Sequence, residues 1–237
     1  MMTLVFGVVG GIGLFLLGMT LLTDGLKAFA GEALQRALVR FTGTPLQAFR
    51  SGAVVTALMQ SSSATTVAVI GFVSAGLLTF PQAVGLILGA SLGTTSTGWL
   101  VSILGLKISI GTYALPVVGI GALLHVLGRG RWSALGLALA GFGLIFVGIE
   151  TLQTGMRDLA TRFPLSNLPH GGIASQLLTI ILVFALTVVM QSSSAAVATT
   201  LTALEANAVN FEQAILLLIG ASGGTIVTAI LAAIGAN

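Results

Sequence analysis

Residues 60–66 read QSSSATT, and residues 191–197 read QSSSAAV. The first four residues of each stretch, 60–63 and 191–194, are called here the first and the second tetrad. Each tetrad interrupts a strongly apolar run, which precedes it over 53–59 in the first case and over 180–190 in the second. A buried hydroxyl or amide without a hydrogen-bond partner costs about 2–7 kcal/mol. Two such clusters therefore predict a buried polar site, in which the tetrads face each other and hold a small polar solute.

The composition around the tetrads is that of a membrane protein. The 237 residues are 56% hydrophobic and 6% charged, with a mean hydropathy of +1.10, whereas soluble domains carry about 25% charged residues. The apolar runs are long, continuous and numerous, which predicts an all-α integral membrane protein that crosses the cell inner (plasma) membrane several times. The nine basic residues suit a topology signal better than a nucleic-acid surface, so no nucleic-acid partner is expected.

The first tetrad is predicted to lie near the middle of the membrane. A spanning helix over 4–22 and an amphipathic surface helix over 23–41 precede it. From Arg50 to Gln60 is ten residues, or about 15 Å of helix, which is half of a hydrocarbon core about 30 Å thick. The chain then leaves through 64–78. This pattern predicts a re-entrant helical hairpin, with two full spans as the alternative.

A second polar interruption follows within the next apolar run. Residues 81–104 are long enough to span the membrane, but residues 89–97 read GASLGTTST. Polar and glycine residues in the middle of a span recur at transporter binding sites, and here they predict a broken spanning helix. Residues 108–128 form a further predicted span.

The chain repeats itself at an offset of 130 or 131 residues. The glycine-bearing first span matches at 130, and the tetrads and the following glycine–threonine pattern match at 131, so the matches persist over about 85 residues. Three crossings precede the second copy, and an odd number inverts it. We therefore predict two inverted-topology repeats, each with a spanning helix, a re-entrant hairpin and a broken spanning helix. Their boundaries are 1–105 for the first repeat, 106–131 for a connecting transmembrane helix and 132–237 for the second repeat.

The predicted breaks bring together two kinds of ligand group. A half-helix begins after each break, and its free N–H groups and positive dipole end favour an anion. Carbonyl oxygens at the ends of the incoming half-helices suit a hard cation such as Na⁺. No basic side chain lies in any break, so a bound anion needs neutral donors and a cation beside it. The pattern predicts cation-coupled transport of an anion.

The doubled QSSS motif, with a glycine–threonine break after each copy, resembles the bacterial and type II sodium–phosphate cotransporter family over nearly the whole chain. The resemblance implies a secondary active transporter for sodium-coupled uptake of inorganic phosphate, with both solutes held at mid-membrane between the repeats. It implies that phosphate binds at Gln60, Ser61, Ser62, Ser63, Thr65, Thr94, Gln191, Ser192, Ser193, Ser194 and Thr225. It implies that Na⁺, the co-transported ion, binds at Gln60, Ser91, Thr95, Gln191, Ser222 and Thr228.

Two departures from the family pattern bear on these expectations. Ser91 and Ser222 stand where the second motif of the family usually has Asn, which leaves the sodium stoichiometry and the solute open. Many bacterial members carry a PhoU-like helical domain after the last span. This chain stops at Asn237, so we expect that domain to be absent or removed.

Other function classes share parts of this pattern. A passive anion channel, or a sodium-coupled carrier of a different small anion, would also need the polar centre. An intramembrane serine hydrolase would need a base beside a serine, but His125 and His170 have no counterparts in the other repeat, so no enzymatic activity is expected. The lipid bilayer is the expected surrounding, and the oligomeric state stays open, with a homodimer as one arrangement.

Overall fold

The computed structural model describes residues 2–107, 111–162 and 172–235, and within them every regular element is a helix. The prediction of an all-α protein is therefore confirmed for this part of the chain. The elements are α1 (Met2–Arg40), α2 (Pro45–Met59), α3 (Ser62–Ser74), α4 (Phe80–Trp99), the π-helix η1 (Leu100–Lys107), α5 (Gly111–Leu127), α6 (Arg131–Arg162), α7 (Ile173–Met190), α8 (Ser193–Glu205), α9 (Phe211–Gly224) and α10 (Ile226–Gly235).

Four helical stretches in the described residues are long and apolar enough to cross a membrane. Each has at least 18 residues, and an α-helix needs about 20 to cross the hydrocarbon core. These stretches confirm the prediction of a membrane protein by length and composition. They are Phe6–Ala30, Phe80–Leu106, Arg131–Asp158 and Phe211–Leu231.

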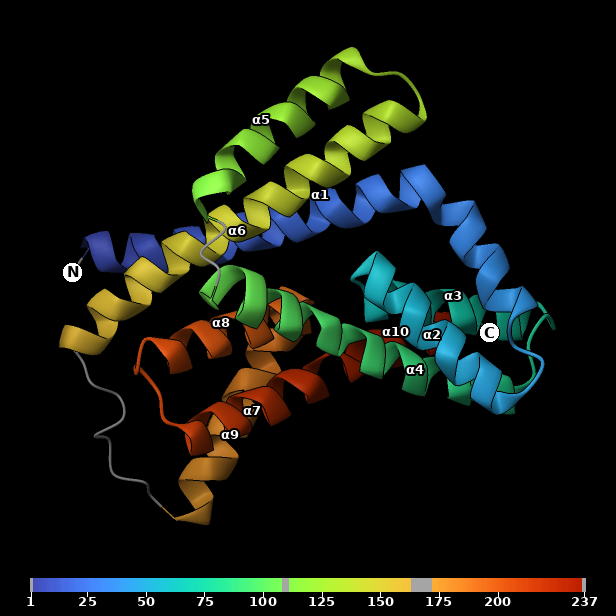
Figure 1. Ribbon diagram of the computed structural model, residues 1–237. Helices are drawn as coiled ribbons and strands as arrows, with labels where there is room; N and C mark the ends of the chain where they lie inside the picture. The colour runs from blue at the N-terminus through green and yellow to red at the C-terminus, as the bar shows by residue number, and fades with distance from the viewer. Residues whose placement is uncertain (1, 108–110, 163–171, 236–237) are drawn as a thin grey trace.

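The first predicted span and the predicted surface helix form one continuous helix. Helix α1 runs for 39 residues, and Figure 1 shows it as a long, bent ribbon that passes α6 and then turns towards α2 and α3. Gly25 lies inside this helix, where it packs closely against Ala138 of α6. The helix ends at Arg40, and Thr44 caps α2 by accepting a hydrogen bond from the Gln47 backbone N–H.

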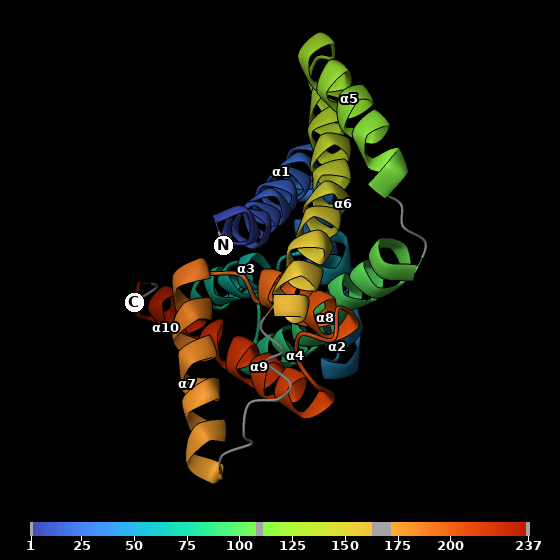
Figure 2. The same cartoon turned by 90° about the vertical axis from the view of Figure 1, so that its left-hand side faces the viewer.

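Helices α1 and α6 pack antiparallel along a seam of glycines, and they lie side by side in Figures 1 and 2. A Cβ at Gly18 would lie 2.6 Å from the Ile145 nitrogen, and one at Gly148 would lie 2.5 Å from the Phe15 nitrogen. At the offset of 130, Gly18 corresponds to Gly148 and Phe15 to Ile145, so the two contacts are reciprocal. Two further reciprocal pairs follow the same offset. In one pair Gly11 contacts Leu152 and Gly141 contacts Leu22; in the other Gly25 contacts Ala138 and Gly155 contacts Val8.

The predicted break within residues 89–97 is wrong. Helix α4 runs through these residues without interruption, and its last turn passes directly into η1. The hydroxyls are satisfied inside the helix, since Ser91 donates to the Ile87 carbonyl and Thr94 to the Ala90 carbonyl. The glycines serve close packing instead: a Cβ at Gly93 would lie 2.5 Å from the Ala53 carbonyl oxygen of α2.

The second copy of this segment has a one-residue interruption at Thr225, whose backbone stays in the helical region, with φ −75° and ψ −16°. Helix α9 ends at Gly224, α10 begins at Ile226, and Thr225 lies between them. The packing on the preceding helix is the same as in the first copy. A Cβ at Gly220 would lie 2.6 Å from the Ile180 carbonyl oxygen, and one at Gly224 would lie 2.8 Å from the Phe184 carbonyl oxygen.

The largest buried apolar cluster joins α1, α6 and α8, with one residue each from η1 and α5. Phe15 of α1 and Ile149 of α6 are each 1% exposed, and Ala195 and Ala198 of α8 are buried against them. Figure 2 shows α8 lying beneath α6, with α3, α4, α9 and α10 gathered around it. The glycine seam and this cluster therefore fix the start of α8, which carries the last two residues of the second tetrad, against the long helices.

Candidate substrate-binding site

The first tetrad forms a sharp break between two helices. Helix α2 ends at Met59, and Gln60 takes the left-handed conformation, with φ 54° and ψ 25°. Ser61 is extended, and its hydroxyl accepts a hydrogen bond from the Ala64 backbone N–H at 3.3 Å, which caps α3. A left-handed Gln followed by a serine cap turns the chain and starts a new helix. The cap uses the Ala64 N–H, and the N–H groups of Ser62 and Ser63 before it have no partner within the helix.

The second tetrad repeats this backbone almost degree for degree. Gln191 has φ 53° and ψ 23°, and Ser192 has φ −143° and ψ 100°, against φ −145° and ψ 99° for Ser61. The Ser192 hydroxyl accepts from the Ala195 N–H at 3.2 Å and caps α8. The same four residues thus build the same anion-suited helix start twice.

Both tetrads line one cavity of about 330 Å³, which we call the tetrad cavity. All eight tetrad residues contribute to its wall, so the structure brings together the two clusters that the sequence predicts to face each other. The wall is completed by Leu16, Met19, Thr20, Thr23, Asp24 and Lys27 of α1 and by Met190 of α7.

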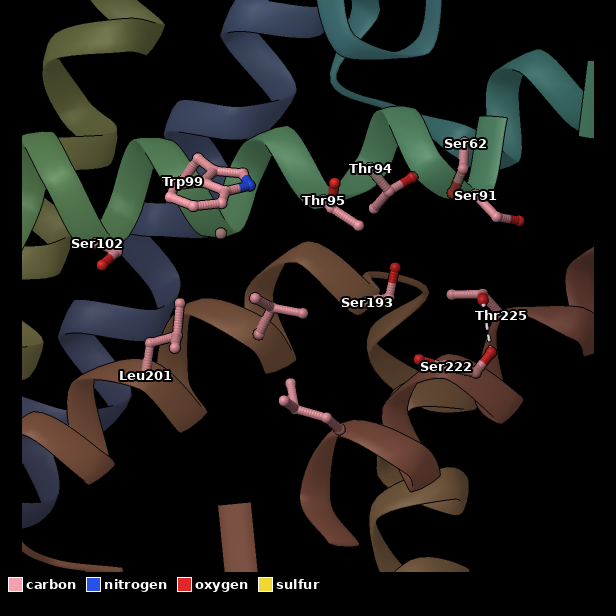
Figure 3. A pocket seen from close by; sticks show the side chains of 13 residues that line it. Ser62, Ser91, Thr94, Thr95, Trp99, Ser102, Ser193, Leu201, Ser222 and Thr225 are labelled. Atoms are coloured by element: carbon pink, nitrogen blue, oxygen red, sulfur yellow. Dashed lines mark hydrogen bonds between the residues drawn. The ribbon is translucent and has the colours of Figure 1, made fainter. Parts of the chain in front are cut away.

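A second cavity, of about 530 Å³, lies between α4 on one side and α8 and α9 on the other, and we call it the α4–α9 cavity. In Figure 3 the hydroxyl-bearing residues of α4 face Ser193, Ser222 and Thr225 across it. Ser62 and Ser193 line both cavities. The first residues of α3 and α8 thus form a wall that the two polar cavities share.

Hydrogen bonds tie the first tetrad to α4 and to the second tetrad. The Gln60 amide donates to the Ser96 hydroxyl at 2.9 Å, and its carbonyl oxygen accepts from Thr97 at 2.9 Å. The Thr97 hydroxyl lies 3.4 Å from that of Ser194. Gln60 is 8% exposed, whereas Gln191 is exposed and donates to the Val188 carbonyl. The two glutamines therefore share a backbone conformation but not a side-chain environment.

The sequence-predicted residues divide between the two cavities. Besides the tetrads, the α4–α9 cavity collects Ser91, Thr94, Thr95, Ser222 and Thr225. The predicted sodium ligands are therefore split, with the two glutamines in one cavity and the serines of α4 and α9 in the other.

Two predicted ligands stand apart from both cavities or outside the description. Thr65 lines neither cavity; it is 1% exposed and accepts a hydrogen bond from Thr56 at 2.9 Å behind the tetrad. The side chain of Thr228 lies outside the described residues.

Asp24 and Lys27 are site residues that the sequence analysis assigned to a surface helix. Together with Thr20 and Thr23 they follow the i, i+3, i+4, i+7 spacing of one helix face. That polar stripe, at the end of an apolar span, was the signal that could have revealed them. It reaches the tetrads because α1 continues unbroken past residue 22.

One buried hydroxyl marks a difference between the two copies. Thr56 donates to Thr65, but at the offset of 131 the equivalent residues are Thr187 and Ala196. Thr187 is 0% exposed, and its hydroxyl has no hydrogen-bond partner among the described residues. An unsatisfied buried polar group costs about 1–3 kcal/mol.

We expect Thr187→Val, which keeps the shape and removes the hydroxyl, to raise stability by about 1 kcal/mol. The matched change Thr56→Val, which removes a satisfied hydroxyl, should lower stability by a similar amount. Thermal unfolding of both variants in one detergent measures the two shifts. Shifts of the same sign would contradict the conclusion that the Thr187 hydroxyl is unsatisfied and the Thr56 hydroxyl is hydrogen-bonded.

Comparison with known proteins gives a family match and several relatives. A family model described as Na⁺/Pi-cotransporter matches residues 14–154. The uncharacterized protein YqeW of Bacillus subtilis (strain 168) is 34% identical over 226 residues, which cover 93% of this chain and 70% of the relative. The putative inorganic phosphate export protein YjbB of Escherichia coli (strain K12) is 29% identical over 228 residues, 95% of this chain.

The relatives named for phosphate export are longer than this chain. The match spans 41% of YjbB from Escherichia coli (strain K12) and 43% of YjbB from Escherichia coli O157:H7. No solved structure matches the chain.

Proposed function

The chain belongs to the Na⁺/Pi-cotransporter family, and from this premise we propose that it is a secondary active transporter that couples the uptake of inorganic phosphate to Na⁺ across the plasma membrane. The observation that carries the proposal is the tetrad cavity, because both tetrads line it. Phosphate is held there by serine hydroxyls and by the free N–H groups at the starts of α3 and α8.

Helix lengths support a re-entrant hairpin at each tetrad. Helices α2 and α3 have 15 and 13 residues, or about 22 and 20 Å, and a spanning helix needs about 30 Å. Helices α7 and α8 have 18 and 13 residues, or about 27 and 20 Å. In our proposal the chain enters on one helix, turns at the tetrad and returns on a helix too short to span, so that both tetrads lie within the membrane; α7, with 18 residues, approaches spanning length, whereas α2, α3 and α8 do not.

The reciprocal glycine contacts support inverted repeats. Two antiparallel helices exchange identical contacts only if a two-fold axis perpendicular to them relates one to the other. The pair Gly18–Ile145 and its counterpart Phe15–Gly148 have this relation, and α1 and α6 occupy equivalent positions of residues 1–105 and 132–237. An axis of this kind, lying in the membrane plane, is the arrangement of inverted-repeat transporters.

Sodium completes the site by balancing the charge of the anion. Carbonyl oxygens at the ends of α2 and α7, at Met59 and Met190, lie beside the tetrads, and Met190 lines the tetrad cavity. Oxygen ligands of this kind suit Na⁺. Co-binding of Na⁺ and phosphate then couples the movement of one to the other.

A second candidate, export of phosphate, is favoured by the names of the YjbB relatives. Measuring transport separately in the inward and the outward direction distinguishes export from uptake. Export would place the same tetrad cavity on an outward path.

Reconstitution of the purified chain into liposomes tests the function. We expect labelled phosphate to enter when Na⁺ is high outside, and to enter at the background rate when choline replaces Na⁺. Equal uptake in both media would indicate a passive channel, and uptake of another small anion in place of phosphate would correct the solute. Preloaded liposomes with Na⁺ high inside measure the outward direction.

A further inference from the structure

Asp24 and Lys27 are the only charged side chains among the described residues that line the tetrad cavity and the α4–α9 cavity. They lie about one turn apart on α1, and both are exposed to the cavity side of the helix rather than buried in the packing. All other groups lining the two spaces are hydroxyls, amides, backbone and apolar side chains.

A phosphate ion carries between one and two negative charges near neutral pH, and neutral donors leave that charge uncompensated. A hydrogen bond to a charged group contributes about 1.5–3 kcal/mol, roughly twice a neutral one. A lysine ammonium is a compact point charge and a common phosphate ligand. The tetrad cavity therefore combines hydroxyl donors of the tetrads with one basic side chain from α1.

We propose that Lys27 contacts the transported phosphate and that Asp24 contacts the co-transported Na⁺. The proposal rests on the proposed function and adds to it the charged residues of the site. A single helix turn that carries both charges keeps the anion and the cation adjacent, so each solute lowers the electrostatic cost of binding the other.

Packing fixes the rotation of α1 that brings these two side chains to the cavity. On one side Gly25 packs against α6, where an added Cβ would lie 2.7 Å from the Ala134 carbonyl oxygen. On another side Thr23 is 9% exposed and donates to the Met59 carbonyl, the last residue before the first tetrad, at 3.3 Å. The charges are therefore held beside the tetrad by contacts on both flanks.

The sequence duplication supplies a matched comparison. At the offset of 130, Asp24 corresponds to Thr154 and Lys27 to Arg157. Arg157 lies 3.9 Å from Glu205, and it does not line the tetrad cavity. The site thus takes its charged wall from the first copy alone, and Arg157 serves as a basic control at the equivalent position.

Phosphate binding to the purified full chain, measured in saturating Na⁺, tests Lys27. We expect Lys27→Gln to weaken phosphate affinity by about tenfold to a hundredfold, Lys27→Arg to stay within about threefold of the parent because it keeps the charge, and Arg157→Gln to leave affinity unchanged. Should the Gln variant fail to fold, Lys27→Met keeps the apolar stem and takes its place.

Sodium dependence tests Asp24 separately. Asp24→Asn should raise the Na⁺ concentration that gives half-maximal phosphate binding by about fivefold or more, with phosphate affinity restored at high Na⁺. A purely structural role would change phosphate and sodium dependence together and would not be rescued by Na⁺.

The outcomes separate the two levels of the argument. Parental phosphate affinity in folded Lys27→Gln, or a loss as large in Arg157→Gln, would overturn the assignment of Lys27 while leaving phosphate transport in place. An unchanged Na⁺ dependence in Asp24→Asn would overturn the assignment of Asp24. A parent chain that binds no phosphate would overturn the proposed function and the inference with it.

Discussion

Replacing Ser63 or Ser194 by alanine should weaken phosphate binding by about tenfold or more in each case. The two serines come from different tetrads and line the same cavity, so in the proposed function one phosphate ion would accept hydrogen bonds from both. A hydrogen bond to a charged group contributes about 1.5–3 kcal/mol, and 1.4 kcal/mol is a factor of ten in affinity. Ser194 is 6% exposed, and the change to alanine removes a single oxygen atom together with its 3.4 Å contact with the Thr97 hydroxyl.

The double variant distinguishes a shared site from two separate ones. If both serines contact one ion, the double variant should bind more weakly than either single variant, by about a hundredfold if the two losses add and by a different factor if they are coupled through the ion. Ser74→Ala, at the exposed far end of α3, is the matched control and should bind like the parent. Binding and transport at the parental level in one single variant would show that one tetrad works alone.

Gly18→Ala and Gly148→Ala should each unfold or strongly destabilise the protein. The added Cβ would lie 2.6 Å from the Ile145 nitrogen in the first case and 2.5 Å from the Phe15 nitrogen in the second. Both neighbours are backbone atoms, so no change of rotamer relieves the overlap, and α1 and α6 must move apart. Overpacking of this kind costs about 1–3 kcal/mol and sometimes more.

Thermal unfolding in detergent measures this cost, and Gly13→Ala supplies the control. Gly13 lies on the same helix, with no heavy atom within 4 Å of an added Cβ, so its replacement should leave the melting temperature unchanged or raise it slightly. Because Gly18 and Gly148 occupy equivalent positions at the offset of 130, the two losses should be similar. A loss in one variant alone would contradict the reciprocity of the seam.

The α4 segment illustrates where sequence reasoning fails. A glycine and threonine pattern within an apolar run fits both a broken span and a straight helix that packs closely on a neighbour. In the first copy Gly89 and Gly93 pack against the backbone of α2, and the hydroxyls of Ser91 and Thr94 donate to carbonyls of their own helix. The nearly identical pattern in the second copy ends a helix at Gly224, so the local residues alone do not decide between the two outcomes.

The sequence by itself determined the class of the protein and the shape of each tetrad. Composition establishes a helical membrane protein because lipid requires every backbone group to be bonded within the segment. The tetrad backbone is local, since a left-handed Gln and a serine that caps three residues ahead need no distant partner, and both copies adopt it.

Only the tertiary structure decided which side chains share a cavity. Whether Asp24 and Lys27 face lipid, water or the tetrads depends on the rotation of α1, and that rotation is set by the contacts of Gly25 with α6 and of Thr23 with Met59. These contacts join residues 36 or more positions apart, and no local pattern encodes them. The tetrads can therefore be identified from the sequence, while the assembly of the polar groups into one cavity depends on helix packing.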